Sequence, residues 1–287
     1  MNKIRLEAST VSDNVRTALA EDIGAGDVTA SLIPENAVAT ASVLTREDAV
    51  ICGQPWFDEV FRQLGGGTTI EWDCEEGQSV PADSVICRLN GNARILLTGE
   101  RTALNFLQML SATATTAAQY AQAVAGTGCA VLDTRKTIPG LRDAQKYAAA
   151  CGGAANHRFG LYDGVLIKEN HIMAAGGIRE AVLAARSTAL DLPVEVEVED
   201  MDEVREALVA GADILLLDNF TNNELEAAVS LNHELRSTPA KLEASGNVTL
   251  ESIHNIADSG VDFISVGAIT KHIRAVDLSM RFRINPL

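Results

Sequence analysis

The sequence predicts an α/β protein whose second half is built from parallel strand–helix units. Short apolar runs alternate with helical stretches from residue 129 onwards, the first third mixes strand-like and helical patterns, and 47% of the 287 residues are apolar. Alternation at roughly 20–30 residues per unit is typical of a parallel barrel or an open parallel sheet.

The first third predicts two short helices, several strands and one long helix. Apolar residues from Val11 to Leu19 recur at helical spacing and predict a helix that ends near Gly24. Residues 24–34 predict a loop, residues 38–51 short strands, and Pro55 opens a helix that the glycines at 65–67 stop. Residues 68–74 and 85–90 predict two strands around a turn. Residues 95–125 predict a helix, with a break near Ser111 as an open alternative.

The turn between these two strands resembles that of a lipoyl or biotinyl carrier. Such a carrier needs an exposed lysine for its prosthetic group, and no lysine occurs between Lys3 and Lys136. We therefore interpret the turn as structural.

Six apolar runs after residue 128 predict the strands of the second half, at 129–134, 164–168, 194–199, 212–218, 241–245 and 261–267. Helices are expected between them at 172–189, 201–210, 222–234 and 249–259. A closed eight-unit barrel usually needs about 250 residues. A barrel in this chain would therefore be short of strands or open on one side.

Composition excludes several classes of protein. The chain has 39 acidic and 23 basic residues, a formal net charge of −16, which argues against a nucleic-acid partner. No apolar run approaches the ~18 residues of a membrane span, and the first residues lack the apolar core of a secretion signal. The five cysteines are scattered without a CxxC pair or zinc-ligand spacing, so we expect reduced thiols in a cytoplasmic protein.

Each predicted strand ends in charged residues or in a small-residue turn, and the charges are sorted along the chain. Because ligands bind at the carboxyl ends of strands in barrels and open sheets alike, these groups should converge on one site. Residues 135–168 hold six basic and two acidic residues, which favours a polyanionic ligand. The turns at 245–247 and 266–268 each precede a helical segment and suit a phosphate group.

The next two strands supply acids. Glu197 and Asp218 end adjacent strands, and two carboxylates beside a phosphate site favour Mg²⁺ or stabilise a positive transition state. Glu195, Glu197 and Glu199 alternate, so they share one face of their strand. We expect Glu197 in the site, Glu199 at the rim and Glu195 deep and paired with a cation.

Seven segments, taken in order, resemble the quinolinate phosphoribosyltransferase (decarboxylating) family, also called nicotinate-nucleotide pyrophosphorylase, across essentially the whole chain. They are LLTGERTALNFLQMLS (96–111), LDTRKTIPGLR (132–142), CGGAANHRFGLYDGVLIKENHI (151–172), VEVEVED (194–200), LLLDN (215–219), EASGN (243–247) and ISVGAITKHIRAVDLSMRF (264–282). The resemblance implies transfer of phosphoribosyl from phosphoribosyl pyrophosphate (PRPP) to quinolinate, giving nicotinate mononucleotide, pyrophosphate and CO₂ in NAD biosynthesis, with Mg²⁺ and no organic cofactor.

The resemblance also implies the architecture. It places an N-terminal α/β domain at residues 1–111, with the C-terminal segment 273–287 packed back on it, and an incomplete α/β barrel at residues 112–272. Members of the family are homodimers or larger homo-oligomers, in which Arg101 would complete the active site of the neighbouring subunit.

The remaining site residues are implied by the same motifs. The quinolinate carboxylates would contact Arg135, His157, Arg158 and Lys168, while Lys136, and Lys168 as well, would sit near the PRPP phosphates. Glu197 and Asp218 would face the ribose and Mg²⁺, so that the catalytic set is Lys136, Lys168, Glu197 and Asp218. Further substrate-binding residues would be Thr134, Ser245, Gly246, Asn247, Val266, Gly267 and Ala268. His171 and His272 flank these motifs and are interpreted as structural.

Two other functions stay open at this point. A related phosphoribosyltransferase with another acceptor would share the same motifs. A Schiff-base aldolase would use a lysine that ends a barrel strand, as Lys168 does. The excess of basic residues around Lys168 suits a dianion better than a neutral carbonyl substrate.

Overall fold

The structure, a computed structural model, describes residues 6–65, 67–188 and 191–284. The chain divides into two compact units, each with its own contacts. Unit 1 comprises Met1–Ala118, Thr137–Gly153 and Ala268–Leu287, and unit 2 comprises Gln119–Lys136 and Ala154–Gly267. The domain limits implied by the family resemblance, at 111/112 and 272/273, stay a prediction.

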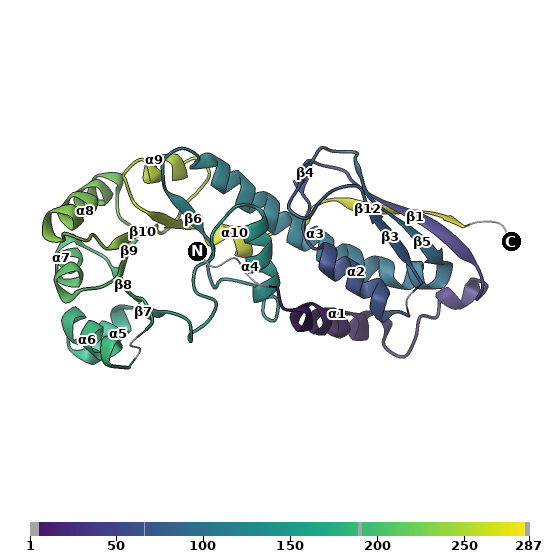
Figure 1. Cartoon of the computed structure of the whole chain (residues 1–287), viewed down its shortest axis with the longest axis horizontal. Coiled ribbons are helices and arrows are strands. Elements are labelled where there is room, and N and C mark those ends of the chain that lie inside the picture. The colour runs from purple at the N-terminus through teal and green to yellow at the C-terminus, as the bar shows by residue number, and fades with distance from the viewer. Residues whose placement is uncertain (1–5, 66, 189–190, 285–287) are drawn as a thin grey trace. The chain divides into compact units, whose positions relative to one another are not determined.

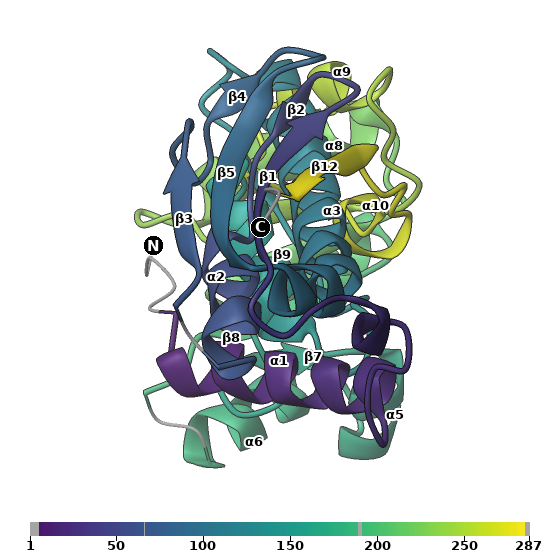
Figure 2. The same ribbon diagram turned by 90° about the vertical axis from the view of Figure 1, so that its right-hand side faces the viewer.

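Unit 1 is built on an antiparallel sheet of four strands in the order β12-β1-β5-β3 (Figures 1 and 2). The strands are β1 (Val38–Thr45), β3 (Thr69–Trp72), β5 (Val85–Asn92) and β12 (Leu278–Ile284), and β2 (Ala49–Val50) pairs separately with β4 (Ser79–Val80). β12 pairs with β1 along its whole length, so the end of the chain joins the sheet formed by its beginning.

The helices of unit 1 are α1 (Ala8–Ile23), the 3-10 helix η1 (Ala30–Leu32), α2 (Gln54–Gln63), α4 (Arg142–Cys151) and α10 (Ala268–Lys271). α1 and α2 lie where the sequence predicts helices, whereas η1 falls within the predicted loop. α1 buries Val11, Val15 and Leu19, as its spacing predicts. α2 buries Trp56 and Phe57 in the aromatic part of the core, where burial of large side chains contributes most stability.

The long helix α3 (Ala93–Ala123) is continuous, so the alternative of a break near Ser111 was wrong. Ser111 is fully buried, and its hydroxyl accepts a hydrogen bond from the main-chain N–H of Cys52 at 3.0 Å and donates to the Cys52 carbonyl at 3.2 Å. A tertiary partner thus satisfies the hydroxyl, which therefore does not compete for the main chain of its own helix.

Unit 2 is an open parallel sheet of six strands in the order β6-β11-β10-β9-β8-β7. The strands are β6 (Ala130–Leu132), β7 (Val165–Ile167), β8 (Val194–Val198), β9 (Ile214–Asp218), β10 (Lys241–Ser245) and β11 (Phe263–Ser265). All six lie where the apolar runs predict them. β6 and β7 form the two edges, so the predicted α/β fold with an incomplete barrel is confirmed and a closed barrel is excluded.

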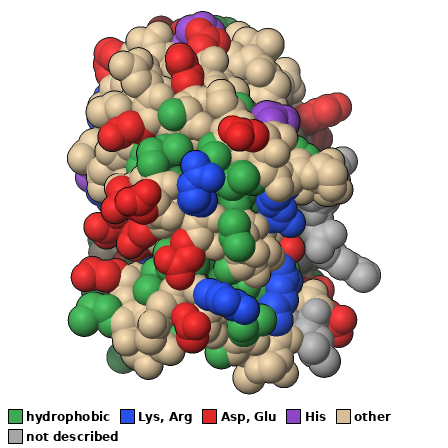
Figure 3. Space-filling view, turned by 90° about the vertical axis from the view of Figure 1, so that its left-hand side faces the viewer, with side chains coloured by type: hydrophobic (Ala, Val, Ile, Leu, Met, Phe, Trp, Pro, Cys, Tyr) green, Lys and Arg blue, Asp and Glu red, His purple; other side chains and the backbone are tan. Residues whose placement is uncertain are grey.

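Helices cover the outer side of this curved sheet (Figure 1). They are α5 (Glu169–Ala175), α6 (Ile178–Thr188), α7 (Met201–Ala210), α8 (Asn222–Leu235) and α9 (Ile253–Ala257). Their exposed faces, seen in Figure 3, carry many acidic side chains and fewer basic ones, in keeping with the net charge of −16.

Two predicted helices differ in extent from the structure. The helix expected at 172–189 is two helices, because Gly176 ends α5 with a φ of 96°, a left-handed conformation that favours glycine. Residue 189 lies outside the described residues. The helix expected at 249–259 is reduced to the short α9, preceded by turns from Thr249.

Within the ranges 6–65, 67–188 and 191–284, we find no helix with the length and hydropathy of a membrane span. All five cysteines belong to these ranges and are free thiols, three of them buried.

Candidate active site

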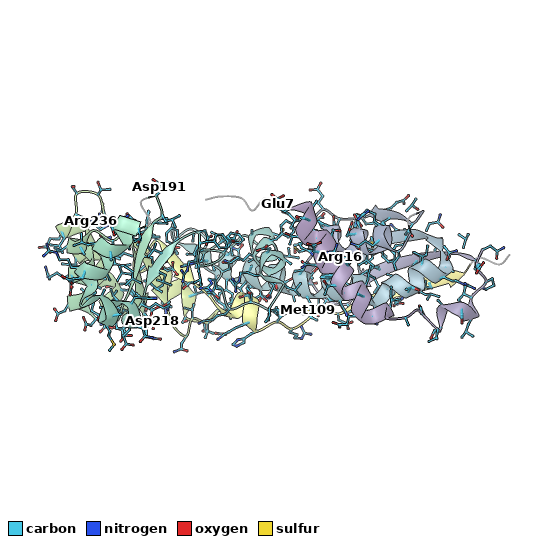
Figure 4. The ribbon with its side chains drawn as sticks, turned by 90° about the horizontal axis from the view of Figure 1, so that it is seen from below. Glu7, Arg16, Met109, Asp191, Asp218 and Arg236 are labelled. Atoms are coloured by element: carbon cyan, nitrogen blue, oxygen red, sulfur yellow. The ribbon has the colours of Figure 1, made fainter. Side chains whose placement is uncertain are left out.

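The candidate site lies at the carboxyl ends of the strands of unit 2. Figure 4 shows Asp218, which ends β9, on one side of this unit, and Asp191 and Arg236, which lie near the amino ends of strands, on the other. Parallel strands bring all their carboxyl ends to the same edge of a sheet. The polar strand ends identified in the sequence therefore share one edge.

Two arginines form the cationic part of this edge. Arg135 follows β6, and its guanidinium Nε is buried without a hydrogen-bond partner among the described residues. Burial, followed by the positive charge of Arg135, lowers the pKa of the Arg158 guanidinium. A buried N–H without a partner costs free energy, and so do two neighbouring cations, unless an anion binds between them.

Lys168 connects the cationic and acidic parts of the edge. It is exposed at the end of β7, and its ammonium group forms an ion pair with the carboxylate of Glu197 on the adjacent strand β8. Its main-chain N–H donates to His171 Nδ1 at 3.0 Å, which closes a capping interaction at the start of α5. His171 thus has the structural role expected for it.

The acids of β8 and β9 are graded by depth. Glu195 is buried, Glu197 is half-buried and Glu199 is exposed, the order that the alternation predicts. Asp218 accepts a hydrogen bond from the Ser245 hydroxyl at 2.5 Å. Desolvation, followed by repulsion from neighbouring carboxylates, raises the pKa of Glu199; those carboxylates belong to Glu169, Glu203, Asp218 and Glu197. This end of the sheet therefore carries an excess of negative charge.

The turn after β10 is held tightly against the turn after β9. Gly246 has a φ of 98°, and a Cβ atom placed on it would lie 2.1 Å from Asn219 Oδ1. Asn219 donates from its side chain to Asp218 Oδ2 at 2.7 Å and from its main chain to the Ser245 carbonyl at 3.0 Å. Only glycine fits at position 246, and this fit holds Asp218 and Ser245 together.

The turn after β11 contacts the strand-end loop of β6. A Cβ atom on Gly267 would lie 3.1 Å from Lys136 Cδ and 3.8 Å from Lys136 Nζ, so the exposed lysine lies over the glycine. Lys136 also donates its main-chain N–H to the Thr134 hydroxyl at 3.1 Å. Val266 donates its N–H to the Leu132 carbonyl, and Ala268 begins α10.

His157 lies deeper, with partners on both ring nitrogens. Its Nδ1 accepts the main-chain N–H of Arg158 at 2.7 Å, and its Nε2 lies 3.1 Å from a carboxylate oxygen of Glu195. Its own main-chain N–H donates to the buried Asp133 carboxylate at 3.0 Å. Glu243 on β10 is 3.6 Å from the same Nε2.

Comparison with known proteins agrees with this geometry. Residues 27–111 match the N-terminal domain and residues 113–281 the C-terminal domain of quinolinate phosphoribosyl transferase. The chain belongs to this family.

Relatives cover nearly all of the chain. A probable nicotinate-nucleotide pyrophosphorylase [carboxylating] from Synechocystis is 42% identical over 92% of this chain and 89% of its own. The nicotinate-nucleotide pyrophosphorylase [carboxylating] of Mycobacterium leprae is 38% identical over 96% and 98%. The solved structure of nicotinate-nucleotide pyrophosphorylase from Francisella tularensis superposes with a TM-score of 0.93, at 48% identity over 97% and 98%.

Within this quinolinate phosphoribosyl transferase fold, unit 2 brings together all the predicted site residues except two. Arg101 is exposed on α3, and Ala268 begins α10; both belong to unit 1. Sequence reasoning counted Asp133 and Asn219 among the strand-end groups but gave them no role, and it gave none to Glu243; the side chains of all three contact site residues. Strand alternation was the available signal for Glu243, because it points to the same face of β10 as Ser245.

Proposed function

We propose that this chain catalyses transfer of phosphoribosyl from PRPP to the ring nitrogen of quinolinate with decarboxylation, giving nicotinate mononucleotide, pyrophosphate and CO₂ in NAD biosynthesis. Membership of the quinolinate phosphoribosyl transferase family supports this reaction. The single observation in the structure that carries it furthest is the Nε of Arg135 beside Arg158, buried and without a partner in the described part of the chain, because two adjacent guanidinium groups match a dicarboxylate.

In this proposal, Arg135, Arg158 and Lys168 hold the two carboxylates of quinolinate. Each guanidinium can donate two parallel N–H bonds to one carboxylate, which fixes the ring as well as binding it. His157 is assigned to the same carboxylates; its Nδ1 accepts the main-chain N–H of Arg158, and its Nε2 lies 3.1 Å from a Glu195 oxygen.

The acidic part of the edge is assigned to the ribose and to Mg²⁺. Glu197 and Asp218 offer the carboxylate oxygens that Mg²⁺ prefers, and they end adjacent strands of unit 2. These two carboxylates would hold the ion. When bound, it offsets the negative charge of the pyrophosphate leaving group.

The two turns and Lys136 are assigned to phosphate. Residues 245–247 offer main-chain N–H groups in a turn that contains the positive φ of Gly246 and of Asn247, a geometry that forms anion-binding concavities. Lys136 Nζ lies against Gly267 in the second turn, so its ammonium group would reach a phosphate bound there. Thr134 and Val266 are assigned to the same phosphate.

The chemistry follows from the charges. As the bond from ribose C1 to pyrophosphate breaks, C1 gains oxocarbenium character, which the carboxylates of Glu197 and Asp218 stabilise. The quinolinate nitrogen then attacks C1. Once quaternised, it stabilises the electron pair left at C2 when the C2 carboxylate departs as CO₂, and C2 takes a proton from solvent. Holding the two substrates in line is the main contribution of the protein.

We also propose that the enzyme is a homodimer or a larger homo-oligomer, in which the partner subunit contributes an arginine to each site. Arg101 is exposed on α3, in the unit that does not contain the strand ends. An exposed arginine on a rigid helix is suited to reach a carboxylate across a subunit interface.

The aldolase alternative has less support. A Schiff-base lysine must be present as a neutral amine, whereas the Lys168 ammonium group is paired with Glu197. A phosphoribosyltransferase for another acceptor would keep the phosphate turns but would not need two adjacent arginines at the acceptor.

The deciding experiment is to incubate the purified chain with quinolinate, PRPP and Mg²⁺ and to measure nicotinate mononucleotide and CO₂. Both products should appear in equal amounts, and omitting Mg²⁺ should suppress them. A parallel reaction with nicotinate tests the alternative acceptor. Product from nicotinate but not from quinolinate would overturn the proposal.

A further inference from the structure

Two thiols and a carboxylate form a cluster inside unit 1 that the reaction proposed above does not use. The sulfur atoms of Cys52 and Cys151 and a carboxylate oxygen of Glu76 all lie within 4.8 Å of one another. Cys52 precedes α2, Glu76 lies in the turn before β4, and Cys151 is the last residue of α4. The fold therefore brings together two of the cysteines that are scattered in the sequence.

Cys52 is the buried, protonated member of the pair. Its side chain is fully buried, and its S–H donates to Glu76 Oε1 at 3.3 Å. Burial, followed by the hydrogen bond with Cys151 and the negative charge of Glu76, raises the pKa of the Cys52 thiol. The Ser111 hydroxyl bonds both the main-chain N–H and the carbonyl of Cys52, so it fixes the residue at this position.

Cys151 is the reactive member of the pair. It is half-buried, so a small solute can reach its sulfur. The hydrogen bond with Cys52 lowers the pKa of the Cys151 thiol, and one with Tyr147 adds to this effect against the opposing effects of burial and of Glu76. Burial raises the pKa of the other four cysteine thiols. Because the thiolate is the nucleophilic form, Cys151 should be the first of the five to react with an electrophile.

The surroundings of Cys151 keep its sulfur close to that of Cys52. A Cβ atom on Gly152 would lie 2.1 Å from the Ala114 carbonyl oxygen, so the chain after Cys151 runs directly against α3. A Cβ atom on Gly77 would lie 3.3 Å from the Cys151 carbonyl oxygen. Two sulfurs within 4.8 Å must approach to about 2.05 Å to form a bond, and rotation about the Cα–Cβ bonds supplies movement of this size.

The hydrogen bonds of Glu76 favour a thiol pair over a metal site. Two cysteines and a glutamate are potential metal ligands. The Glu76 carboxylate, however, accepts the main-chain N–H of Gly53 at 2.8 Å and that of Gln54 at 3.1 Å, and so caps the start of α2. With the Cys52 S–H as a third donor, this carboxylate is placed to receive the Cys52 proton.

We propose that Cys52 and Cys151 are a peroxide-responsive thiol pair: Cys151 reacts with hydrogen peroxide, and Cys52 then forms with it a reversible disulfide between the start of α2 and the end of α4. The structure shows the reduced state, in which both residues are free thiols. Neither step involves quinolinate or PRPP, so this proposal does not depend on the proposed function.

The two steps balance in atoms and electrons. The Cys151 thiolate attacks one oxygen of hydrogen peroxide; the O–O bond breaks, an S–O bond forms, and the other oxygen leaves as hydroxide, which takes up the proton that Cys151 lost. The Cys52 sulfur then attacks the Cys151 sulfur while its proton passes to Glu76. The S–S bond forms, the S–O bond breaks, and the departing hydroxide takes that proton as water. One peroxide thus oxidises two thiols to one disulfide and two waters, and a dithiol reductant returns the two electrons.

The first test treats the whole reduced enzyme with increasing hydrogen peroxide, alkylates the remaining thiols and maps all five cysteines by mass spectrometry. The peptides of Cys52 and Cys151 should appear joined, lighter by two hydrogen atoms than the sum of the reduced peptides. Dithiothreitol should restore both thiols. Oxidation of Cys151 without this joined peptide, or no oxidation of Cys151 at all, would overturn the proposal.

Cys129 is the matched control outside the cluster. It is half-buried like Cys151, but its S–H donates to the Ala130 carbonyl at 3.8 Å, and burial, followed by the charge of Asp262, raises its pKa to about 12. Peroxide should oxidise Cys151 at least about tenfold faster than Cys129 in the folded enzyme, and at a similar rate in urea. Equal rates in the folded enzyme, or the same preference in urea, would overturn the proposal. Cys129→Ser should leave the yield of the disulfide unchanged, and loss of the disulfide in this variant would count equally against the pair.

Cys52→Ser tests the second step. Without its partner thiol, Cys151 should be oxidised further to the sulfinic acid, with a mass gain of two oxygen atoms that dithiothreitol does not reverse. Oxidation of Cys151 as reversible as in the wild type would show that another group resolves it, and the pair would be refuted. Circular dichroism checks the fold of the variant, and Cys52→Ala replaces it if serine is not tolerated in the core.

Discussion

Replacing Gly246 by alanine should damage both stability and activity, and the size of each effect follows from the local geometry. Gly246 has a φ of 98°, which a residue with a side chain adopts at a cost of about 1–3 kcal/mol. The added Cβ would also lie 2.1 Å from Asn219 Oδ1 and 3.0 Å from Asn219 N, so the Asn219 turn must move. Overpacking of this kind costs about 1–3 kcal/mol more.

Gly260→Ala separates these two contributions. Gly260 has nearly the same conformation, with a φ of 93°, but its added Cβ would meet only Val229 methyl groups at 3.5 and 3.8 Å, which is ordinary contact. The Gly260→Ala variant should therefore be destabilised only by the cost of placing alanine in the left-handed backbone conformation. The free energy of unfolding of Gly246→Ala should be lower than that of Gly260→Ala by about 1–3 kcal/mol, and its midpoint of thermal unfolding by about 2–4 °C per kcal/mol.

The activity of the two variants should differ more sharply. Movement of Asn219 disturbs its hydrogen bond to Asp218, and displacements of about 1 Å near reacting groups cost up to about a hundredfold in rate. We expect kcat/KM for PRPP to fall between about tenfold and a hundredfold in Gly246→Ala and to stay near wild type in Gly260→Ala. Circular dichroism during heating and initial rates at varied PRPP measure both effects. Equal losses of stability and activity in the two variants would refute the argument from close contact.

Four further outcomes are expected. Asp218→Asn should lower kcat far more than it weakens quinolinate binding, because its charge is needed mainly when positive charge develops on the ribose; unchanged turnover with weaker binding would contradict that role. Arg101→Ala and Lys136→Ala should each be inactive, and a mixed, reassembled sample should regain part of the activity; no recovery in demonstrated mixed oligomers argues against a shared site. Nicotinate should be disfavoured relative to quinolinate by ~30-fold or more, because a charged partner left unmatched costs about 2–5 kcal/mol and the buried Nε of Arg135 would lose its carboxylate. Phthalate should compete with quinolinate in the same assay, and comparable turnover of nicotinate would exclude the dicarboxylate site. Borohydride with a carbonyl substrate should leave Lys168 unmodified by mass spectrometry, and a stoichiometric adduct there would favour the aldolase.

Local sequence pattern determined most of the secondary structure. The six strands of unit 2 lie at the predicted apolar runs, because a strand buried on both faces must be apolar along its length. The helix at α1 follows from the spacing of Val11, Val15 and Leu19, and its end from Gly24. These features depend on neighbours a few residues apart, so the sequence alone predicts them.

Long-range contacts decided the elements that the sequence left open. Ser111 has the small polar side chain of a helix break, yet α3 continues because Cys52 supplies its hydrogen-bond partners from 59 residues away. The choice between a barrel and an open sheet depended on whether β6 and β7 pair with each other. Neither the hydrogen bonds between Ser111 and Cys52 nor the pairing of edge strands can be predicted from a short stretch of sequence.

The candidate site divides in the same way. The order of basic and acidic residues at successive strand ends, together with the family resemblance, predicted which residues gather at that edge. Parallel strands bring every carboxyl end to the same edge of the sheet. Only the tertiary structure showed that His157 lies against Glu195 and Glu243, that Gly246 packs against Asn219, and that Arg135 has a buried donor without a partner among the described residues. Burial and hydrogen bonding depend on atoms brought together from distant strands, and these contacts determine the direction and surroundings of each side chain.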